Sequence, residues 1–212
     1  MKKFLLTLAV MIIMSTTSYA AQELPESLLS KLTVIDALNE RKSSRNFVDR
    51  DLEESQVTKI LWAANGVTRP DGKRVNPAAM GVYSVEVYAV TREGIFLYDP
   101  QSNGIIPIAE GDYRMTTTTG QSFVANAALN LVYVETPDAW ANAKHTPPPR
   151  DRQIAFANIA VGAMVQSVAL AAQTEGLGNC VRGSINHDEF RKVARLSDEK
   201  TILLAQSVGF IK

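Results

Sequence analysis

The stretch DRQIAFANIAVGAMVQSVALAAQT, residues 151–174, carries almost no charge after Arg152 and is apolar nearly all the way round a helix. It follows the proline-rich residues 146–149, which break the chain, and it precedes Gly176, which is well placed to end a helix. A helix that is apolar on most sides is buried in a core or across a subunit interface. This segment is therefore expected to be the long helix around which the fold is arranged.

Shorter elements flank this helix on both sides. Amphipathic patterns predict helices at 33–41, 53–64, 121–127 and 186–194, with Thr33 as an N-cap. Alternating or apolar runs predict strands at 85–90, 95–98, 105–108, 128–134, 178–183 and 202–210, and turn residues at 92–94 and 103–104 favour hairpins. The predicted class is α+β: one domain at residues 33–212, with a mainly antiparallel central sheet surrounded by helices.

Residues 1–20 have the three parts of a secretory signal peptide. Lys2 and Lys3 precede an apolar run at 4–14, and Ser18 and Ala20 are the small residues at the −3 and −1 positions. The apolar run is too short to span a bilayer comfortably, so no permanent membrane anchor is expected. We expect cleavage after Ala20, a linker at 21–32, and export to the periplasm.

The charge balance and the cysteine and histidine content indicate which kinds of binding partner to expect. The 22 basic residues balance 22 acidic ones, and loss of Lys2 and Lys3 leaves 22 − 2 = 20 basic residues, which gives no general reason to bind nucleic acid. Cys180 is the single cysteine, so it forms no intramolecular disulfide, and its apolar setting predicts a core position. His145 and His187 are far apart in sequence, so both are expected at the surface and no metal site is predicted. Small molecules and a second copy of the chain remain as partners.

A cluster of cations and hydroxyls lies at the end of the first predicted helix, in Arg41-Lys42-Ser43-Ser44-Arg45. Two interpretations stay open. The cations can complement the negative end of the helix dipole, or they can form an anion site in which guanidinium groups and hydroxyls satisfy a phosphate. The motifs GxGxxG, GxxxxGK[ST], HExxH and GxSxG do not occur, which disfavours ordinary dinucleotide, P-loop and hydrolase sites.

Four segments together resemble the flavin-dependent nitroreductase superfamily. ERKSSRNF at 40–47 resembles its R-x-S-x-R-x-F opening, while LWAANGVTR at 61–69 and PAAMGVYSVEVY at 77–88 resemble segments of its SagB-type azoline dehydrogenase branch. Residues 162–166 and Gly176-Leu177-Gly178 resemble the family's G-xxx-Q helix and GLG turn. The matches fall in the expected order over residues 33–210. The resemblance implies a homodimer built around the long helix, with one flavin mononucleotide (FMN) at each end of the interface.

The same resemblance implies the site residues. Arg41, Lys42, Ser43 and Arg45 would contact the phosphate, ribityl chain and pyrimidine edge of the flavin, where a fixed cation favours reduction. Pro77, Ala78, Ala79, Met80 and Gly81 would line one face of the ring. Gly176, Leu177 and Gly178 would let backbone from the partner subunit approach the ring. Gln166 and Arg182 are further candidates, and Lys212 ends the chain where many family members continue into a basic, phosphate-binding tail.

The implied activity is FMN-dependent ping-pong hydride transfer through flavin N5, to or from a small organic molecule such as a nitroaromatic or a quinone. Two alternatives stay open: a dehydrogenase that oxidises its substrate without nicotinamide, and a flavin-binding protein without turnover. For the dehydrogenase, Tyr83, Glu86 and Tyr88 are candidate acid–base groups, although the last two share a strand face on which both are expected to be solvated.

Substrate specificity is expected to depend on the loops at 69–76 and 112–120. The threonine run 116–119 is expected to be mobile surface, and a lid over the flavin is the alternative. Soluble reduced nicotinamide is scarce outside the cytoplasm. The predicted export therefore disfavours NAD(P)H as the electron donor.

Overall fold

The computed structural model describes residues 32–212, so the predicted signal peptide and the linker up to residue 31 lie outside the described residues. One six-stranded sheet has the order β3-β2-β1-β4-β6-β5, and all its neighbouring strands are antiparallel. The strands are β1 (Val85–Val90), β2 (Gly94–Asp99), β3 (Gly104–Glu110), β4 (Leu129–Glu135), β5 (Gly178–Arg182) and β6 (Thr201–Gly209). The α+β class and the mainly antiparallel sheet are therefore confirmed.

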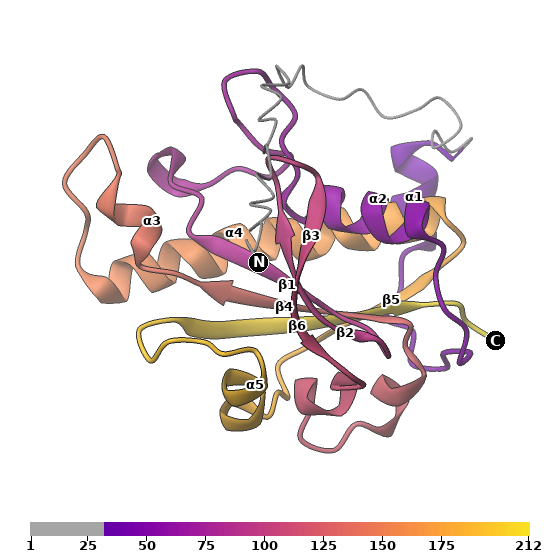
Figure 1. Ribbon diagram of the computed structural model, residues 1–212. Coiled ribbons are helices and arrows are strands. Elements are labelled where there is room, and N and C mark those ends of the chain that lie inside the picture. The colour runs from indigo at the N-terminus through magenta and orange to yellow at the C-terminus, as the bar shows by residue number, and fades with distance from the viewer. Residues whose placement is uncertain (1–31) are drawn as a thin grey trace, which may run out of the picture.

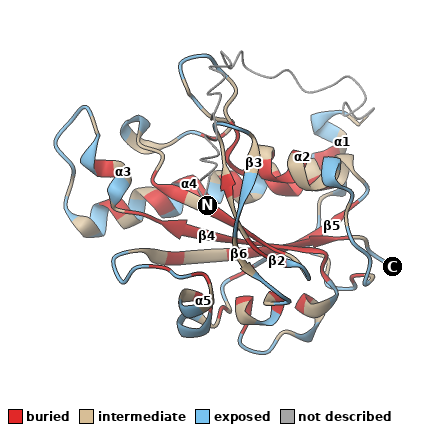
Figure 2. Cartoon of the chain, in the orientation of Figure 1, coloured by how far each residue is buried: buried red, intermediate tan, exposed pale blue. Residues whose placement is uncertain are grey.

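Helices cover both faces of the sheet (Figure 1). On one face, α2 (Glu54–Asn65) and α4 (Arg150–Thr174) pack over a core that includes Val87, Leu131 and Tyr133. On the other face, α5 (His187–Val193) places Phe190 over a second core that includes Val132 and Val134. The central strands are consequently buried on both faces, as their red colour in Figure 2 shows.

This double burial corrects the expectation for Tyr88. Alternation along β1 separates two buried faces rather than a buried face from a solvated one. Tyr88 belongs to the second core and is only 3% exposed, with its ring edge-on to Phe190. Cys180 is buried, as predicted, and His145 and His187 are exposed, as predicted.

The long helix α4 has 25 residues and so extends for about 37 Å. Ala157, Val161, Met164 and Val168 are buried on the side that packs on the sheet. The opposite side is uncovered, and Ile159 on it is 71% exposed. The helix is also long and apolar enough to cross a membrane, a property that core helices of soluble proteins share. In a single chain, α4 is thus an apolar helix with only one side covered.

The smaller elements include two departures from prediction. Thr33 caps α1 (Val34–Glu40) in a capping box with Asp36, as predicted for Thr33. Residues Ser122–Asn126 form a 3-10 helix (η4) rather than an α-helix, and α3 (Asp138–Ala141) was not predicted. The remaining short turns are the 3-10 helices η2 (Ala79–Gly81) and η3 (Arg114–Thr117).

The threonine run 116–119 is not a mobile surface loop. Thr117 and Thr118 are 0% and 3% exposed. The Thr117 carbonyl accepts a hydrogen bond of 2.6 Å from buried Arg182, and the Thr118 hydroxyl accepts from the backbone of Gly120 and Gln121. Internal hydrogen bonding lets these hydroxyl-bearing residues be buried, which composition alone does not reveal.

Candidate functional site

The basic segment at 41–45 lies against the start of β5. Ser43 forms a parallel bridge with Asn179, and the Ser44 amide donates to the Asn179 carbonyl at 2.7 Å. A Cβ on Gly178 would come within 2.8 Å of the Ser44 Cβ and 2.2 Å of the Ile211 Cγ2, so no side chain fits there. The structure therefore brings together, within one chain, the basic motif and the Gly176-Leu177-Gly178 turn.

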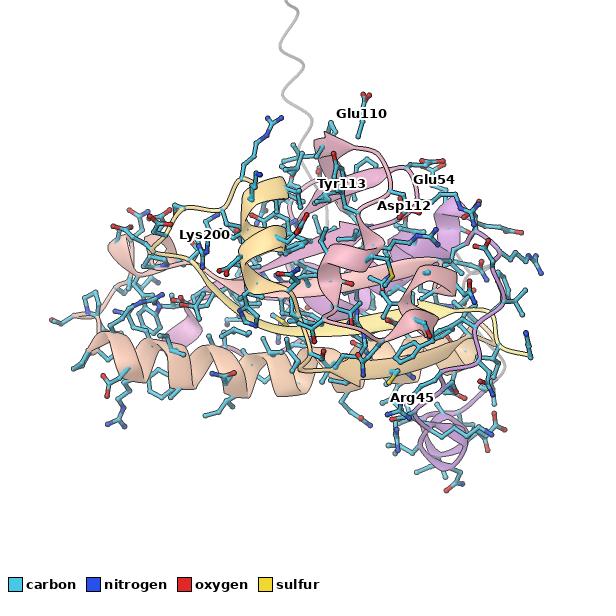
Figure 3. All side chains as sticks on the ribbon, turned by 90° about the horizontal axis from the view of Figure 1, so that it is seen from below. Arg45, Glu54, Glu110, Asp112, Tyr113 and Lys200 are labelled. Carbon is cyan, nitrogen blue, oxygen red and sulfur yellow. The ribbon has the colours of Figure 1, made fainter. Side chains whose placement is uncertain are left out.

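The C-terminus closes this region from the other side. The Lys212 amide donates to the Asn46 carbonyl at 3.1 Å, which fixes the chain end beside the basic segment. Arg45 and Lys212 line one groove of about 500 Å³, together with Asn46, Ser122 and Asn126. Figure 3 shows Arg45 at the α1 end of the molecule, with Lys200 at the opposite end. The groove therefore combines two cations with amide and hydroxyl groups.

The cations of this region have no carboxylate partners within the part of the chain that the structure describes. Among residues 32–212, the side chains of Arg41, Lys42, Arg45 and Lys212 form none of the ion pairs or side-chain hydrogen bonds found. Arg114, by contrast, is paired with Asp112 at 2.6 Å. Like charges gathered without partners repel one another and attract an anion.

The helix-dipole interpretation explains only part of this arrangement. Arg41 is the C-cap of α1, and no basic residue lies in the last helical turn. Lys42 and Arg45 lie beyond the helix end, in the segment beside β5. Since the dipole effect fades within about one turn, it applies to Arg41 more than to the other cations.

Asn179 was not among the predicted site residues. Its side chain is 2% exposed, its Oδ1 accepts from Gln206 at 3.2 Å, and its Nδ2 is a buried donor without a hydrogen-bond partner among the described residues. The sequence signal for it was a polar residue directly after the glycine turn and inside an apolar strand. A free buried donor beside the basic segment fits a ligand with acceptor oxygens.

The segment Pro77–Gly81 lies in a different place. Met80 (φ 56°) and Gly81 (φ 69°) have left-handed backbones, and both line a groove of about 470 Å³ with Tyr83 and residues 139 and 142–144 near α3. This groove shares no lining residue with the Arg45 groove. Figure 1 places α3 and the C-terminus at opposite ends of the molecule. One chain therefore does not bring Pro77, Ala78, Ala79, Met80 and Gly81 together with the basic segment.

The remaining predicted residues are divided between surface and interior. Gln166 is exposed on the uncovered side of α4, near Gly162, which is also exposed. Leu177 is 1% exposed in the core, and Gly176 has a left-handed backbone at φ 67°. Gln166 is thus available to a partner, while Leu177 holds the turn in place.

Arg182 is part of the interior rather than an exposed cation. It is 3% exposed, and its guanidinium donates to Ser207 Oγ at 3.0 Å, to the Thr117 carbonyl at 2.6 Å and to Asn130 Oδ1 at 3.2 Å. Burial lowers the pKa of Arg182 to about 10, which still leaves it charged at neutral pH. Its hydrogen bonds join η3 to the sheet.

The three candidate acid–base groups have different surroundings. The Tyr88 hydroxyl donates to Glu86 at 2.9 Å, burial raises the pKa of Tyr88 well above its usual value, and Lys200 contacts Glu86 at 2.7 Å. Tyr83 is half-buried, and its hydroxyl accepts from the Arg74 amide at 3.1 Å. The Tyr88 hydroxyl thus donates to Glu86, whereas the Tyr83 hydroxyl donates to no group among the described residues.

Comparisons with known proteins show the family to which the chain belongs. The Nitroreductase family profile matches residues 38–210. A nitroreductase from Methanocaldococcus jannaschii is 27% identical over 192 residues, covering 86% of this chain and 93% of its own. A solved nitroreductase from Ralstonia eutropha is 28% identical, with a TM-score of 0.80 and coverage of 93% and 92%.

A solved nitroreductase from Desulfovibrio desulfuricans, in complex with FMN, has the same fold. Its TM-score is 0.60 at 17% identity, over 86% of this chain and 88% of that one. The family profile spans the basic segment, the glycine turn and the long helix alike. The chain therefore belongs to the nitroreductase family.

Proposed function

We propose that this chain is an exported FMN-dependent oxidoreductase that works as a homodimer. The observation that carries the proposal is the group of cations at Arg41, Lys42, Arg45 and Lys212, which form no ion pair among the described residues, beside Gly178, where no side chain fits. A phosphate with several acceptor oxygens matches guanidinium, ammonium and hydroxyl donors. The FMN bound by the Desulfovibrio desulfuricans neighbour is a ligand of this chemistry.

The residues present fit FMN as follows. Arg45, Lys212 and the hydroxyl of Ser43 would hold the phosphate, and Arg41 and Lys42 would hold the polar edge of the cofactor. Asn179 Nδ2, a buried donor without a partner among the described residues, would donate to an acceptor oxygen. When bound, FMN supplies two-electron hydride chemistry at N5, and in a ping-pong cycle a donor and then a small organic acceptor use it in turn. The cations of this chain would favour the reduced, more negative form.

The homodimer explains why the predicted site is divided in one chain. Gly162 and Gln166 lie on the uncovered side of α4, which also carries the exposed Ile159. A two-fold interface along this side, with its axis perpendicular to α4, would bring the Arg45 end of one subunit to the Pro77–Gly81 end of its partner, because such an axis makes the two copies of α4 antiparallel. Each site would then be completed by two subunits.

Oxidation of a substrate without nicotinamide is the second candidate function. Its specific support is Tyr83, which lines the Met80–Gly81 groove and whose hydroxyl donates to no group in the described part of the chain. Glu86 and Tyr88 support it less, because they bond to each other and to Lys200. Export makes a donor other than free NAD(P)H the simpler expectation for either function.

The test begins with the absorption spectrum of the purified protein, with and without added FMN. Bound flavin is expected as a yellow protein with absorption maxima shifted from those of free FMN. Protein that stays colourless after FMN is added would refute the proposal.

Anaerobic reduction of the bound flavin then separates the functions. Reduction by NAD(P)H or a small reductant, followed by reoxidation with a nitroaromatic or quinone, supports the oxidoreductase. Reduction by a candidate organic substrate alone supports the dehydrogenase. Bound flavin that no donor reduces supports a binding protein.

A further inference from the structure

A second cavity lies apart from the basic groove, at the other end of the sheet. It is open to the surface, has a volume of about 400 Å³, and is lined by the end of α2, the start of β1, the end of β2 and the chain between β4 and α3. Its apolar wall consists of Val85, Leu97, Tyr98, Pro100 and Ile106. Two of the candidate acid–base groups, Tyr83 and Glu86, line it, and Tyr83 also lines the Met80–Gly81 groove.

Three buried polar atoms around this cavity have no hydrogen-bond partner among the described residues: Asn65 Oδ1, Arg74 Nε and Thr136 Oγ1. Asn65 and Thr136 are only 2% and 7% exposed. The orientation of Asn65 is fixed, since its Nδ2 donates to the Val85 carbonyl at 2.8 Å, which leaves Oδ1 as a free acceptor. Buried polar atoms normally have partners, so three without one around the same cavity indicate a polar ligand.

The charges of the cavity are separated rather than paired. The Arg74 guanidinium lies 4.6 Å from the centre of the Tyr83 ring and forms no ion pair with a described carboxylate. Burial lowers the pKa of Arg74, although the nearby charge of Asp99 acts in the opposite direction.

Carboxylates also line the cavity. Asp99 forms no salt bridge among the described residues, and hydrogen bonds from Ser102, together with the charge of Arg74, lower its pKa and keep it ionised. Glu86 is neutralised by Lys200, and Asp138 is exposed at the rim. The cavity therefore offers one unpaired cation and one half-buried, unpaired anion beside an apolar wall.

We propose that this cavity binds a small zwitterion with an apolar body, namely an apolar α-amino acid. Its carboxylate would accept from Arg74 and the Thr136 hydroxyl, and its ammonium would donate to Asn65 Oδ1 and Asp99. Its side chain would lie along Leu97, Tyr98 and Ile106. This assignment needs no bound flavin, so a titration without FMN tests it separately from the proposed function.

The test is calorimetric titration of the full-length purified protein, with and without FMN, using three probes. L-phenylalanine carries both charges, 3-phenylpropanoate lacks the ammonium, and phenethylamine lacks the carboxylate. L-phenylalanine is expected to bind saturably and more tightly than either analogue. Arg74→Gln is expected to weaken its binding about 10- to 100-fold, the usual effect of losing a charged hydrogen bond.

Two further variants separate binding from folding. Lys73→Gln removes a neighbouring, exposed cation that does not line the cavity, and it should bind L-phenylalanine as the wild type does. Thr136→Val removes the unpaired hydroxyl with little change of shape, and it should weaken binding even where Arg74→Gln fails to fold.

The proposal is overturned by any of three results: an L-phenylalanine dissociation constant beyond about 10 mM, equal binding of phenethylamine, or equal losses in Lys73→Gln and Arg74→Gln.

Discussion

Replacement of Ile159 by glutamate tests whether the uncovered side of α4 is a subunit interface. Ile159 is 71% exposed in the single chain, so a polar residue there removes little packing within the subunit. Exposed helix positions of this kind usually change the free energy of unfolding by less than about 0.5 kcal/mol. The fold of each subunit should therefore survive the substitution.

The effect on a dimer is much larger. Complete burial of an isoleucine side chain stabilises by about 1.5–3 kcal/mol. Since 71% of this residue remains available for burial, each subunit would lose about 1–2 kcal/mol of association free energy. Two-fold symmetry doubles the loss to about 2–4 kcal/mol, which weakens dimerisation by about 30- to 700-fold. Burial of the glutamate charge would increase the loss further.

Sedimentation velocity over a range of concentrations measures this change directly. Met115→Glu is the matched control, because Met115 is 47% exposed on η3, away from α4. The control should keep the wild-type association state, and FMN affinity should fall together with dimerisation in the Ile159 variant. An Ile159→Glu protein that associates like the wild type would show that this side of α4 is not the interface.

Three other substitutions test the site and the fold. Gly178→Ala should lower the free energy of unfolding in urea by about 1–3 kcal/mol, because the new Cβ would overlap Ile211. Arg45→Gln should weaken FMN binding about tenfold and reduce its salt dependence, as measured by quenching of flavin fluorescence. Asp112→Asn should destabilise the protein near neutral pH. Hydrogen bonds from Arg114 hold the pKa of folded Asp112 below its unfolded value of about 3.9. The ionised carboxylate therefore stabilises the folded protein above that pH. The difference in thermal stability between the variant and the wild type should vanish as the pH falls through the folded pKa.

The fold was largely predictable because its elements carry strong local patterns. The period-two alternation of β1 and the apolar length of α4 each specify one kind of element. Alternation does not show whether the second face of a strand is covered, so the burial of Tyr88 depended on where α5 packs. Helix α3 has only four residues, too few to show a period.

Candidate-site residues that are neighbours in sequence could be predicted from a motif. Residues that only the fold brings together could not. Asn65, Arg74 and Thr136 are spread over three segments, and only the fold brings them around one cavity. Arg45 and Arg182 are both arginines, but the fold gives them different hydrogen-bond partners. The guanidinium of Arg182 donates all its hydrogen bonds to Ser207, Thr117, Ser184 and Asn130 inside the fold, whereas Arg45 donates none to the described residues. A sequence motif identifies a cation, but an anion needs hydrogen-bond donors that are not already used within the protein. By this criterion Arg45 is the better candidate anion ligand, and Arg182 is not one.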